Sequence, residues 1–505
     1  MDTATAARAV AGRALGANVR FTRVTTDSRK LAPGDLFVAL PGERFDGHDF
    51  VAAAFERGAA AALVASERAD DLAGPLIAVP DTHAALLALA AHWRARFSIP
   101  VVVVVGSNGK TTVKEMLAAI LREHHGGERV LATTGNLNNA VGLPMTLLAL
   151  TDAHRVAVIE LGMNHRGETA ELAAVAQPTV ALVNNAQREH QEFMRTVSEV
   201  AVEHADLIRA LPPGGIAVVN ADDAHVEVWR DAARARPGVH AVEFALDRPA
   251  AVRGRFTPGS GGSTLALSTP AGDVAVALGG PGRHNAANAL AAATAALALG
   301  TPLDAVARGL AAFRAVRGRL AVLASTAGAT VIDDTYNANP DSVRAAIDVL
   351  AAAPAPRWLV LGDMGEVGAQ GPAYHREAGT RAREGGIDRL FTTGALAAEA
   401  AAAFGDGAAH FASVEALAAH VAAEAGPGTT VLVKGSRFMR MERVVSALAG
   451  DGPSPAQASP AALDAGRPRG GTRADGGEVP PEQASLASPQ GARRPRGGPS
   501  DGGAH

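Results

Sequence analysis

The sequence predicts an α/β protein with three domains: a central, doubly wound and mainly parallel domain is followed by a Rossmann-like C-terminal domain. Its 505 residues are too many for one hydrophobic core. From Ile99 onward, short apolar runs alternate with helical or turn sequence, which is the pattern of parallel sheets that bind ligands at the carboxyl ends of their strands. One such run, residues 101–105, consists of five valines and leads directly into GSNGKTT.

Composition narrows the class of protein. Hydrophobic residues make up 48% of the chain and charged residues 19%, which is typical of a globular protein with an ample core. A net charge of −4, without basic runs interleaved with aromatics, argues against nucleic acid as a partner. The absence of cysteine excludes disulfides, thiolate zinc sites and a cysteine nucleophile, and it fits a cytoplasmic protein.

The N-terminal segment does not have the pattern of a secretory signal. Arg8, Arg13 and Arg20 interrupt its alanine-rich sequence, so an unbroken apolar stretch is missing, and an organellar transit peptide is the remaining alternative. No apolar run reaches the length of about 18 residues that spans a bilayer, so we expect no membrane insertion.

The first domain is predicted to cover residues 1–95. Its strand-like runs are LFVAL, AALVA and LIAVP, and an alanine-rich helix, HAALLALAAHWRARF, follows them. The central domain is predicted to cover residues 96–313, with strands at VVVVV, RVAVIEL, TVALVNN and GGIAVVN. These units support the expected parallel sheet.

The third domain is predicted to cover residues 314–450. Its strands are TVIDDTYNANP, RWLVLGDM, RLFTTG and TTVLVKGS, and Pro340 with Asp341 marks the start of a helix. Residues 451–505 contain mainly Gly, Pro, Ser, Ala and Arg, so we predict a disordered tail that catalysis does not need.

The loop after the five valines predicts a nucleotide phosphate site. Gly106 and Gly109 let the backbone point N–H groups at phosphate oxygens, Lys110 adds a positive charge, and the Thr111 hydroxyl suits Mg2+. A helix over VKEMLAAIL would add the positive end of its dipole. We therefore expect ATP and Mg2+ as cofactors. The predicted ATP-binding loop is Gly106, Ser107, Asn108, Gly109, Lys110, Thr111 and Thr112.

The match to the general phosphate-loop pattern is incomplete. Val104 occupies the place of the first glycine in GxxxxGK[ST]. A plain turn from strand to helix is therefore the alternative interpretation.

Further polar residues follow the ends of predicted strands. Glu160 could reach a metal held by Thr111 and the phosphates, or be a solvated acid. His190 could bind a second metal, or be structural. Asn136, Asn138 and Asn139 lie in a loop that is either a solvated turn or a set of amide contacts for a polar substrate.

Nine motifs in order resemble those of the Mur ligases of peptidoglycan synthesis. The resemblance covers residues 22–447. The motifs are GSNGKTT, TTGNLNNAVGLPMTLL, VIELGMNHRGE, NNAQREHQEF, GRHNAANALAA, RGRL, DDTYNANPDS, LGDMGE and VKGSR. The opening segment TTDSRKLAPGDLFVALPGERFDGHDF likewise resembles the family's UDP-sugar-binding first domain.

The resemblance implies an ATP-dependent, ADP-forming amide ligase. The form of DDTYNANPDS favours addition of D-alanyl-D-alanine to UDP-MurNAc-tripeptide through an acyl phosphate. That reaction belongs to cytoplasmic peptidoglycan precursor synthesis, and so to cell wall biogenesis, cell shape and cell division. We expect a monomer that takes these two substrates and contacts neither membrane nor nucleic acid.

The resemblance also implies roles for individual residues. Lys110, Glu160 and His190 would be catalytic, Thr111 and Glu160 would hold one Mg2+, and His190 would hold a second. The other implied contacts are Asp27, Ser28 and Arg29 with uridine diphosphate, Asn285 and Asn288 with adenine, and Arg319 and Asp334 with nucleotide ribose or phosphate.

One position departs from the family pattern. Many Mur ligases carry a carbamoylated lysine on the helix after the metal histidine, and His204 stands there in this chain. His204, Glu203 or water would have to replace that contact with Mg2+, or the second site is weaker. Activity that does not respond to bicarbonate is the expected consequence.

Other functions remain open at this point. A Mur ligase that adds a single amino acid and a ligase similar to folylpolyglutamate synthase share the phosphate loop and the acyl-phosphate chemistry. A nucleotide-binding protein without ligase activity is the third alternative.

Overall fold

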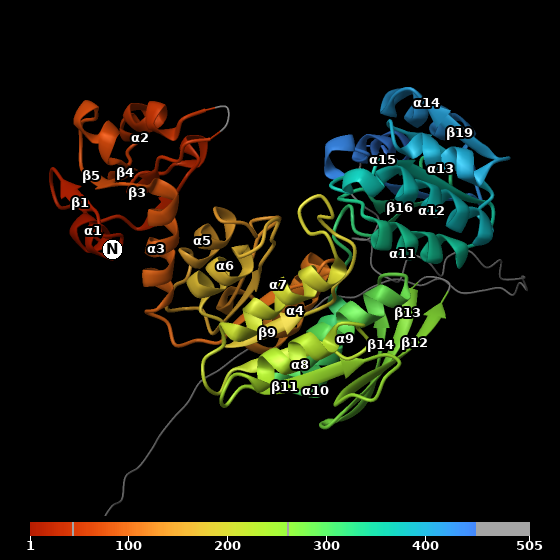
Figure 1. The fold of residues 1–505 in the computed structure, drawn as a ribbon, viewed down its shortest axis with the longest axis horizontal. Helices are drawn as coiled ribbons and strands as arrows, with labels where there is room; N and C mark the ends of the chain where they lie inside the picture. Colours follow the sequence, from red (N-terminus) through yellow and green to blue (C-terminus); the bar gives the residue numbers. More distant parts are fainter. Residues whose placement is uncertain (43–44, 260–261, 451–505) are drawn as a thin grey trace, which may run out of the picture. The chain divides into compact units, whose positions relative to one another are not determined.

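The computed structural model describes residues 1–42, 45–259 and 262–450, which form three sheet-containing domains (Figure 1). The predicted fold class is confirmed. The strands of the three sheets fall within residues 13–79, 101–278 and 321–434. The domain boundaries stated above stay a prediction, and the predicted tail, residues 451–505, lies outside the described residues.

The first domain is a five-stranded sheet in the order β1-β5-β4-β3-β2, parallel except for β1. One face of the sheet packs on α1 and α3 through Leu36, Leu63 and Ile77, and the other packs on α2. The elements are α1 (Thr3–Ala9), β1 (Arg13–Leu15), β2 (Arg23–Thr25), β3 (Asp35–Val38), α2 (Val51–Glu56), β4 (Ala61–Ala65), β5 (Leu76–Val79) and α3 (Thr82–Arg94).

The central domain contains a nine-stranded sheet in the order β14-β13-β12-β11-β10-β9-β6-β8-β7. Its parallel part is formed by β6 (Val101–Val105), β7 (Val130–Ala132), β8 (Val156–Glu160), β9 (Val180–Val183), β10 (Ile216–Asn220), β11 (His240–Ala245) and β12 (Val252–Gly259). Its helices are α4 (Lys110–His125), α5 (Gly142–Leu147), α6 (Glu168–Ala176), α7 (Val197–Arg209), α8 (Val226–Arg234), α9 (Arg283–Ala298) and α10 (Leu303–Ala312).

The five valines of β6 explain why this sheet is covered on both faces. Val101, Val103 and Val105 face the helices α5 to α8, and Val102 and Val104 face α4, α9 and α10. Successive strand residues point to opposite faces, so a strand with valine at every position buries both sides. All five side chains are almost completely buried.

An antiparallel extension lies at one edge of the central sheet. Strands β13 (Gly262–Thr269) and β14 (Gly272–Leu278) pair antiparallel with β12 and with each other. The sequence analysis assigned no strands to this region. In β12, the polar side chains Arg253 and Arg255 are exposed between buried residues, which is the alternation of a strand with one solvated face.

The third domain has a six-stranded sheet in the order β15-β16-β20-β17-β18-β19, parallel except for β15. Helices α11 to α13 cover one face and α14 and α15 the other. The elements are β15 (Ala321–Ala324), β16 (Thr330–Asp334), α11 (Pro340–Ala351), β17 (Arg357–Gly362), α12 (Gly371–Glu384), β18 (Arg389–Thr393), α13 (Ala397–Phe404), β19 (Ala408–Phe411), α14 (Val414–Glu424), β20 (Thr430–Lys434) and α15 (Glu442–Ala449).

The predicted start of helix α11 is confirmed. Pro340 is its first residue, and Asn339 and Ser342 form a reciprocal capping box that satisfies backbone N–H groups at this end. The helix therefore begins at a defined residue beside the loop that follows β16.

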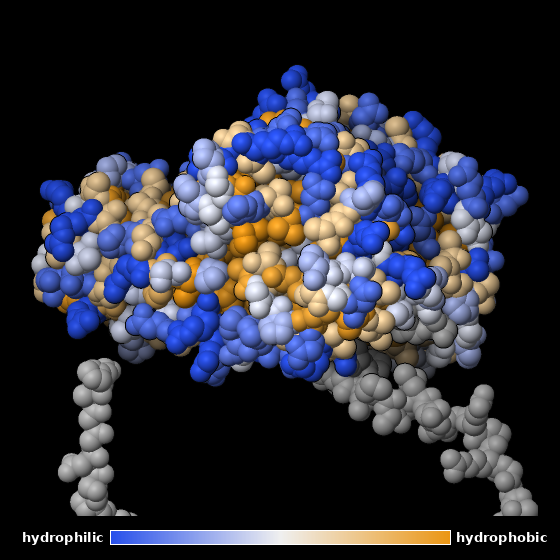
Figure 2. All heavy atoms as spheres, turned by 90° about the horizontal axis from the view of Figure 1, so that it is seen from below, coloured by the Kyte–Doolittle hydropathy of each residue, from blue (hydrophilic) through white to orange (hydrophobic). Residues whose placement is uncertain are grey.

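The surface is polar over most of the face in Figure 2, with hydrophobic residues gathered near its middle. Within residues 1–42, 45–259 and 262–450, no helix has both the length and the apolar character that a membrane crossing requires.

A buried histidine supports the loop after β17. His375 is completely buried on α12, where its Nε2 accepts a hydrogen bond from the Met364 N–H at 3.0 Å and its Nδ1 lies 2.7 Å from the Gly371 carbonyl oxygen. Burial lowers the pKa of His375 below its usual value of 6.5. The neutral imidazole is thus the form that fits the fold.

This histidine predicts a loss of stability at mildly acidic pH. Below pH 6.5, unfolded chains bind a proton at His375 that the folded protein takes up only at lower pH, so the free energy of unfolding falls as the pH is lowered. Urea denaturation at several pH values between 7 and 5 measures the slope of the free energy of unfolding against pH. In His375→Gln, which has no titrating side chain at this position, we expect a shallower slope, and an unchanged slope would exclude His375 as a cause.

Candidate functional site

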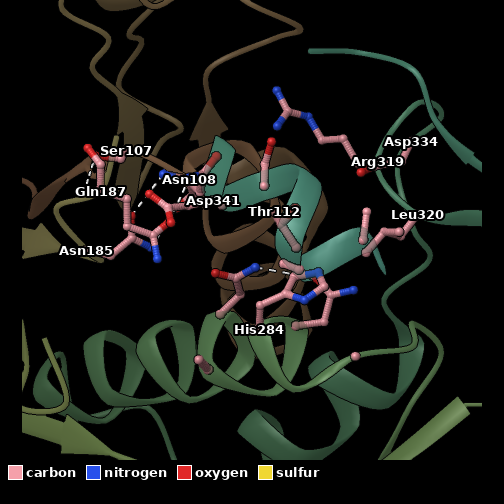
Figure 3. Close-up of a pocket in the computed structure, with 18 of the residues that line it drawn as sticks. Ser107, Asn108, Thr112, Asn185, Gln187, His284, Arg319, Leu320, Asp334 and Asp341 are labelled. Atoms are coloured by element: carbon pink, nitrogen blue, oxygen red, sulfur yellow. Dashed lines mark hydrogen bonds between the residues drawn. The ribbon is translucent and has the colours of Figure 1, made fainter. Parts of the chain in front are cut away.

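Most of the predicted nucleotide, metal and catalytic residues lie at one edge of the central sheet. Strand β6 pairs with β8 on one side and β9 on the other, all three parallel, so their carboxyl ends lie side by side. A cavity of about 1550 Å³ lies at this edge. Residues from the loop after β6, the loop after β9, the start of α9 and the third domain line it (Figure 3). This is where a doubly wound sheet is expected to bind its ligand.

The loop after β6 requires its two glycines. Gly106 has φ 146° and Gly109 has φ 82°, and a Cβ at Gly109 would lie 2.3 Å from the Asn288 side-chain oxygen. Residues other than glycine rarely adopt such φ angles. Helix α4 begins immediately afterwards at Lys110, so its unpaired N–H groups face the cavity edge.

Lys110 is held by oxygen atoms. Its ammonium donates to the carbonyl oxygens of Gly106 at 2.5 Å and Ser107 at 3.3 Å, and to Oε2 of Glu189 at 3.2 Å. These contacts place a positive charge at the mouth of the loop, where phosphates would bind.

Side-chain amides fix the shape of this loop. The Asn184 amide donates to the Asn108 carbonyl and to Oδ1 of Asn288, both at 2.9 Å. The Asn185 amide donates to the same Asn108 carbonyl at 3.0 Å. The loop is therefore tied both to the segment after β9 and to α9.

Glu160 lies at the end of β8 with one carboxylate oxygen free for a ligand. Its Oε1 accepts from the Thr111 hydroxyl at 3.0 Å and the Asn138 amide at 2.8 Å. Its Oε2 is buried and has no hydrogen-bond partner among the described residues. An unsatisfied buried carboxylate oxygen beside a hydroxyl fits a hard divalent cation such as Mg2+, and the predicted first metal site stays a prediction.

His190 lies in a strained turn after β9. Its φ of 48° is unusual for a residue with a side chain. Its Nδ1 lies 2.6 Å from Oε2 of Glu366, and its Nε2 lies 3.8 Å from Oε2 of Glu189. The contact with His190 lowers the pKa of Glu366. His190 is thus positioned between two carboxylates beside Lys110.

Within the described parts of the chain, no group of three or more His, Asp or Glu side chains is arranged to hold a metal ion by itself. Mg2+ commonly uses only one or two protein ligands and completes its shell with water and phosphate oxygens. Thr111 with Glu160, and His190 with its neighbouring carboxylates, suit that mode of binding.

The third domain contributes a charged wall to the cavity. The Arg319 guanidinium lies 4.1 Å from the centre of the Tyr336 ring. Lys434, which is buried, donates to Oδ2 of Asp334 at 2.6 Å and to the Asn337 carbonyl at 2.9 Å. Burial raises the pKa of Asp334, and the charges of Lys434 and Arg319 oppose that effect.

Side chains of the second and third domains are also in direct contact. Asn108 and Asn339 exchange amide hydrogen bonds at 3.0 and 3.3 Å. The Arg188 guanidinium contacts the carboxylates of Asp341 at 2.9 Å and Glu377 at 2.8 Å. In Figure 3, Asp341 lies close to Asn108 and Gln187 of the central domain. The Asn108–Asn339 bonds join the phosphate loop to the start of α11, and the Arg188 contacts join the segment after β9 to α11 and α12.

Three family profiles match consecutive parts of the chain. They are the catalytic domain of the Mur ligase family at residues 20–94, the Mur ligase middle domain at 104–296, and the Mur ligase glutamate ligase domain at 318–437. The chain belongs to the Mur ligase family. The suspected resemblance is thereby confirmed.

Individual relatives extend this family assignment over most of the chain. The UDP-N-acetylmuramoyl-tripeptide–D-alanyl-D-alanine ligase of Escherichia coli K12 is 43% identical over 87% of this chain and 96% of its own length. A crystal structure of MurF from Acinetobacter baumannii has a TM-score of 0.81 and 32% identity, covering 88% of this chain and 97% of that one. MurF from Thermotoga maritima in complex with ADP has a TM-score of 0.73 and 27% identity, covering 84% and 96%.

Most predicted site residues of this Mur ligase line the cavity. Among the predicted nucleotide, metal and catalytic residues, the exception is Gly106, whose carbonyl instead accepts from Lys110. Asn138 and Asn139 line the cavity, but Oδ1 of Asn139 also accepts from the N–H groups of Val141 and Gly142 at the start of α5. Asn136 is exposed and is not among the lining residues.

The predicted uridine diphosphate residues lie elsewhere, in the first domain. Asp27 caps the short 3-10 helix Ser28–Lys30, and its carboxylate accepts from the Arg29 side chain at 2.8 Å. That hydrogen bond lowers the pKa of Asp27 to about 2. Among the described residues, those that line the main cavity come only from the second and third domains. The role of Asp27, Ser28 and Arg29 stays a prediction.

Glu189 and Lys434 are among the charged residues of the Mur ligase site that sequence reasoning did not assign. Glu189 precedes His190 in the motif NNAQREHQEF. Its position next to a candidate metal ligand could have indicated that it belongs to the site. Lys434 ends β20 in the motif VKGS. Its partner Asp334 is 100 residues away in sequence, so only the parallel pairing of β16 with β20 brings the two together.

The buried pair of Lys434 and Asp334 predicts an asymmetric mutational effect. Lys434→Met leaves a largely buried carboxylate without its cation, so we expect a loss of about 3 kcal/mol in the free energy of unfolding. Urea denaturation measures this loss. The double variant Lys434→Met/Asp334→Asn removes both charges and should recover part of it. If Lys434→Met is as stable as the wild type, Lys434 does not offset the charge of Asp334.

Proposed function

We propose that this chain is an ATP-dependent ligase that joins D-alanyl-D-alanine to UDP-MurNAc-tripeptide and releases ADP and phosphate, in cytoplasmic peptidoglycan precursor synthesis. The observation that carries the proposal is the phosphate loop at the shared edge of β6, β8 and β9, with Lys110, Glu160 and His190 converging on it. The identity of 43% over most of the chain to a ligase with this acceptor supports the choice of substrates.

The arrangement suits transfer of a phosphoryl group between anions. The terminal carboxylate of the tripeptide attacks the γ-phosphorus of ATP, which forms an acyl phosphate and ADP. The amine of D-alanyl-D-alanine then attacks the acyl carbon, the amide bond forms, and phosphate leaves. Lys110 and the N–H groups at the start of α4 neutralise charge on the phosphates.

Thr111 and Glu160 would hold the Mg2+ of this reaction. The hydroxyl of Thr111 and the unpartnered Oε2 of Glu160 are the atoms available for it. When bound, Mg2+ supplies positive charge that lets the carboxylate and the triphosphate approach each other. Asn138 keeps the Glu160 carboxylate in its orientation through the 2.8 Å hydrogen bond.

The third domain would complete the nucleotide site. Arg319 and Asp334 line the same cavity as the phosphate loop, and we assign them to the nucleotide ribose or phosphate. Asn285 and Asn288 are buried on α9 and line the cavity, and we assign them to the adenine side. The side-chain amides of Asn138 and Asn139, which line the cavity near Glu160, are assigned to contacts with the polar substrate.

An acceptor screen tests the proposed function. With ATP, Mg2+ and UDP-MurNAc-tripeptide present, D-alanyl-D-alanine should stimulate ADP formation and yield the pentapeptide product by mass spectrometry. Single amino acids should not. Stimulation by a single amino acid, with no response to the dipeptide, would assign the chain to another branch of the Mur ligases.

Lys110→Ala should lower ADP formation by at least about 100-fold, because it removes a charge aimed at the transferred phosphoryl group. Arg234→Ala, which removes an exposed cation on α8 outside the cavity, is the matched control and should keep full activity. Retained turnover in the Lys110 variant would refute the role of the loop.

Glu160→Gln should raise the Mg2+ concentration for half-maximal ADP formation about 10- to 100-fold, because the amide removes the negative charge that would hold the cation. Measuring the rate of ADP formation over a range of Mg2+ concentrations gives this half-maximal value. Glu171→Gln, which makes the same change at an exposed position of α6, should leave the Mg2+ requirement unchanged. If both variants respond alike, Glu160 has no specific metal role.

A further inference from the structure

Glu189 is a buried acid with an unused ligand atom at the edge of the cavity. It is 6% exposed and lines the cavity next to His190. Oε2 faces the Lys110 ammonium at 3.2 Å, but Oε1 has no hydrogen-bond partner among the described residues. An unsatisfied buried carboxylate oxygen is costly unless something binds it.

A cation and two imidazoles surround the Glu189 carboxylate. The Lys110 ammonium lies 3.2 Å from Oε2. Nε2 of His190 lies 3.8 Å from Oε2, and Nε2 of His204 lies 3.6 Å from Oε1. Binding of a triphosphate would attract that ammonium and free Glu189 for another cation.

No lysine is placed to carry a carbamate at this site. The whole sequence has four lysines, at positions 30, 110, 114 and 434. Lys30 is exposed in the first domain, and Lys110 belongs to the phosphate loop. Lys114 is fully buried against the Thr133 carbonyl at 2.7 Å, and Lys434 is paired with Asp334.

The neighbouring acid on α7 is committed elsewhere. Both carboxylate oxygens of Glu203 accept from the Gly167 N–H at 3.0 Å, and Oε1 also accepts from the Thr169 N–H at 2.9 Å. Glu203 thereby satisfies the start of α6. His204 is 1% exposed, and its Nε2 lies 3.6 Å from Oε1 of Glu189. His204 therefore packs behind the Glu189 carboxylate.

We propose that Glu189, together with His190, binds a second divalent cation at the ATP phosphates, and that its fixed carboxylate replaces the carbamoylated lysine of many Mur ligases. The chain then needs no CO2 to complete its metal site. Glu189 and His190 are adjacent in sequence, and their side chains approach to 3.8 Å. His204 is a positioning residue that lies against the carboxylate. The inference rests on the proposed function, since it concerns the same nucleotide site.

Binding of Mn2+ tests the inference without turnover. The full-length protein is titrated with Mn2+ in CO2-free buffer, in the presence of a nonhydrolysable ATP analogue with a β,γ-methylene bridge. Electron paramagnetic resonance counts the bound ions. We expect two Mn2+ per wild-type chain, with the same count and affinities after addition of bicarbonate.

Glu189→Gln should keep one Mn2+ and bind the second at least tenfold more weakly. Glu192→Gln is the matched control, since it makes the same change at an exposed position of the same loop and should bind two ions like the wild type. If the Glu189 variant binds both ions normally, its carboxylate serves only as the counter-ion of Lys110 and the proposal fails.

The wild-type measurement can also overturn the proposal by itself, whatever the stability of the variants. A single Mn2+ in both buffers, or a second ion that appears only with bicarbonate, would contradict it. These outcomes are separate from the acceptor screen, because Mn2+ binding needs neither the tripeptide nor D-alanyl-D-alanine. A chain that fails the acceptor screen but binds two ions through Glu189 would keep this metal site.

Discussion

The Lys110 ammonium is the charge around which the site is built. Taking a cation out of water is unfavourable unless nearby oxygen atoms replace the water, and here two loop carbonyls and the Glu189 carboxylate do so. The two glycines of the loop are needed because only they let carbonyl oxygens turn toward this cation while the following N–H groups face outward. The ammonium, the loop and the start of α4 thus form one unit.

That unit depends on the parallel sheet beneath it. Strands β8, β6 and β9 are adjacent, so Glu160, the phosphate loop and the segment carrying Glu189 and His190 leave the sheet at the same edge. The strand interiors are apolar and buried on both faces, which confines polar side chains to the strand ends. Anionic and cationic groups therefore gather where water is partly excluded, and each acts more strongly there than it would on an open surface.

The charges of the cavity are arranged to accept a polyanion together with divalent cations. Two carboxylates, Glu160 and Glu189, each have an oxygen without a hydrogen bond among the described residues. Across the cavity, Arg319, Lys434 and Asp334 of the third domain form a second charged group. Arg188 connects the two sides by its contacts with Asp341 and Glu377.

The sequence alone determined the fold class, the phosphate loop and the order of the family motifs, because these depend on local patterns: apolar runs, glycine spacing and residues that follow strand ends. Only the tertiary structure decided which charged side chains meet. Lys434 reaches Asp334 through strand pairing, and Glu189 reaches Lys110 through the packing of β9 against β6. The role of Glu203 was equally hidden, since its carboxylate accepts from the backbone N–H groups of Gly167 and Thr169 at the start of α6. Such contacts join residues far apart in sequence, and local spacing carries no information about them.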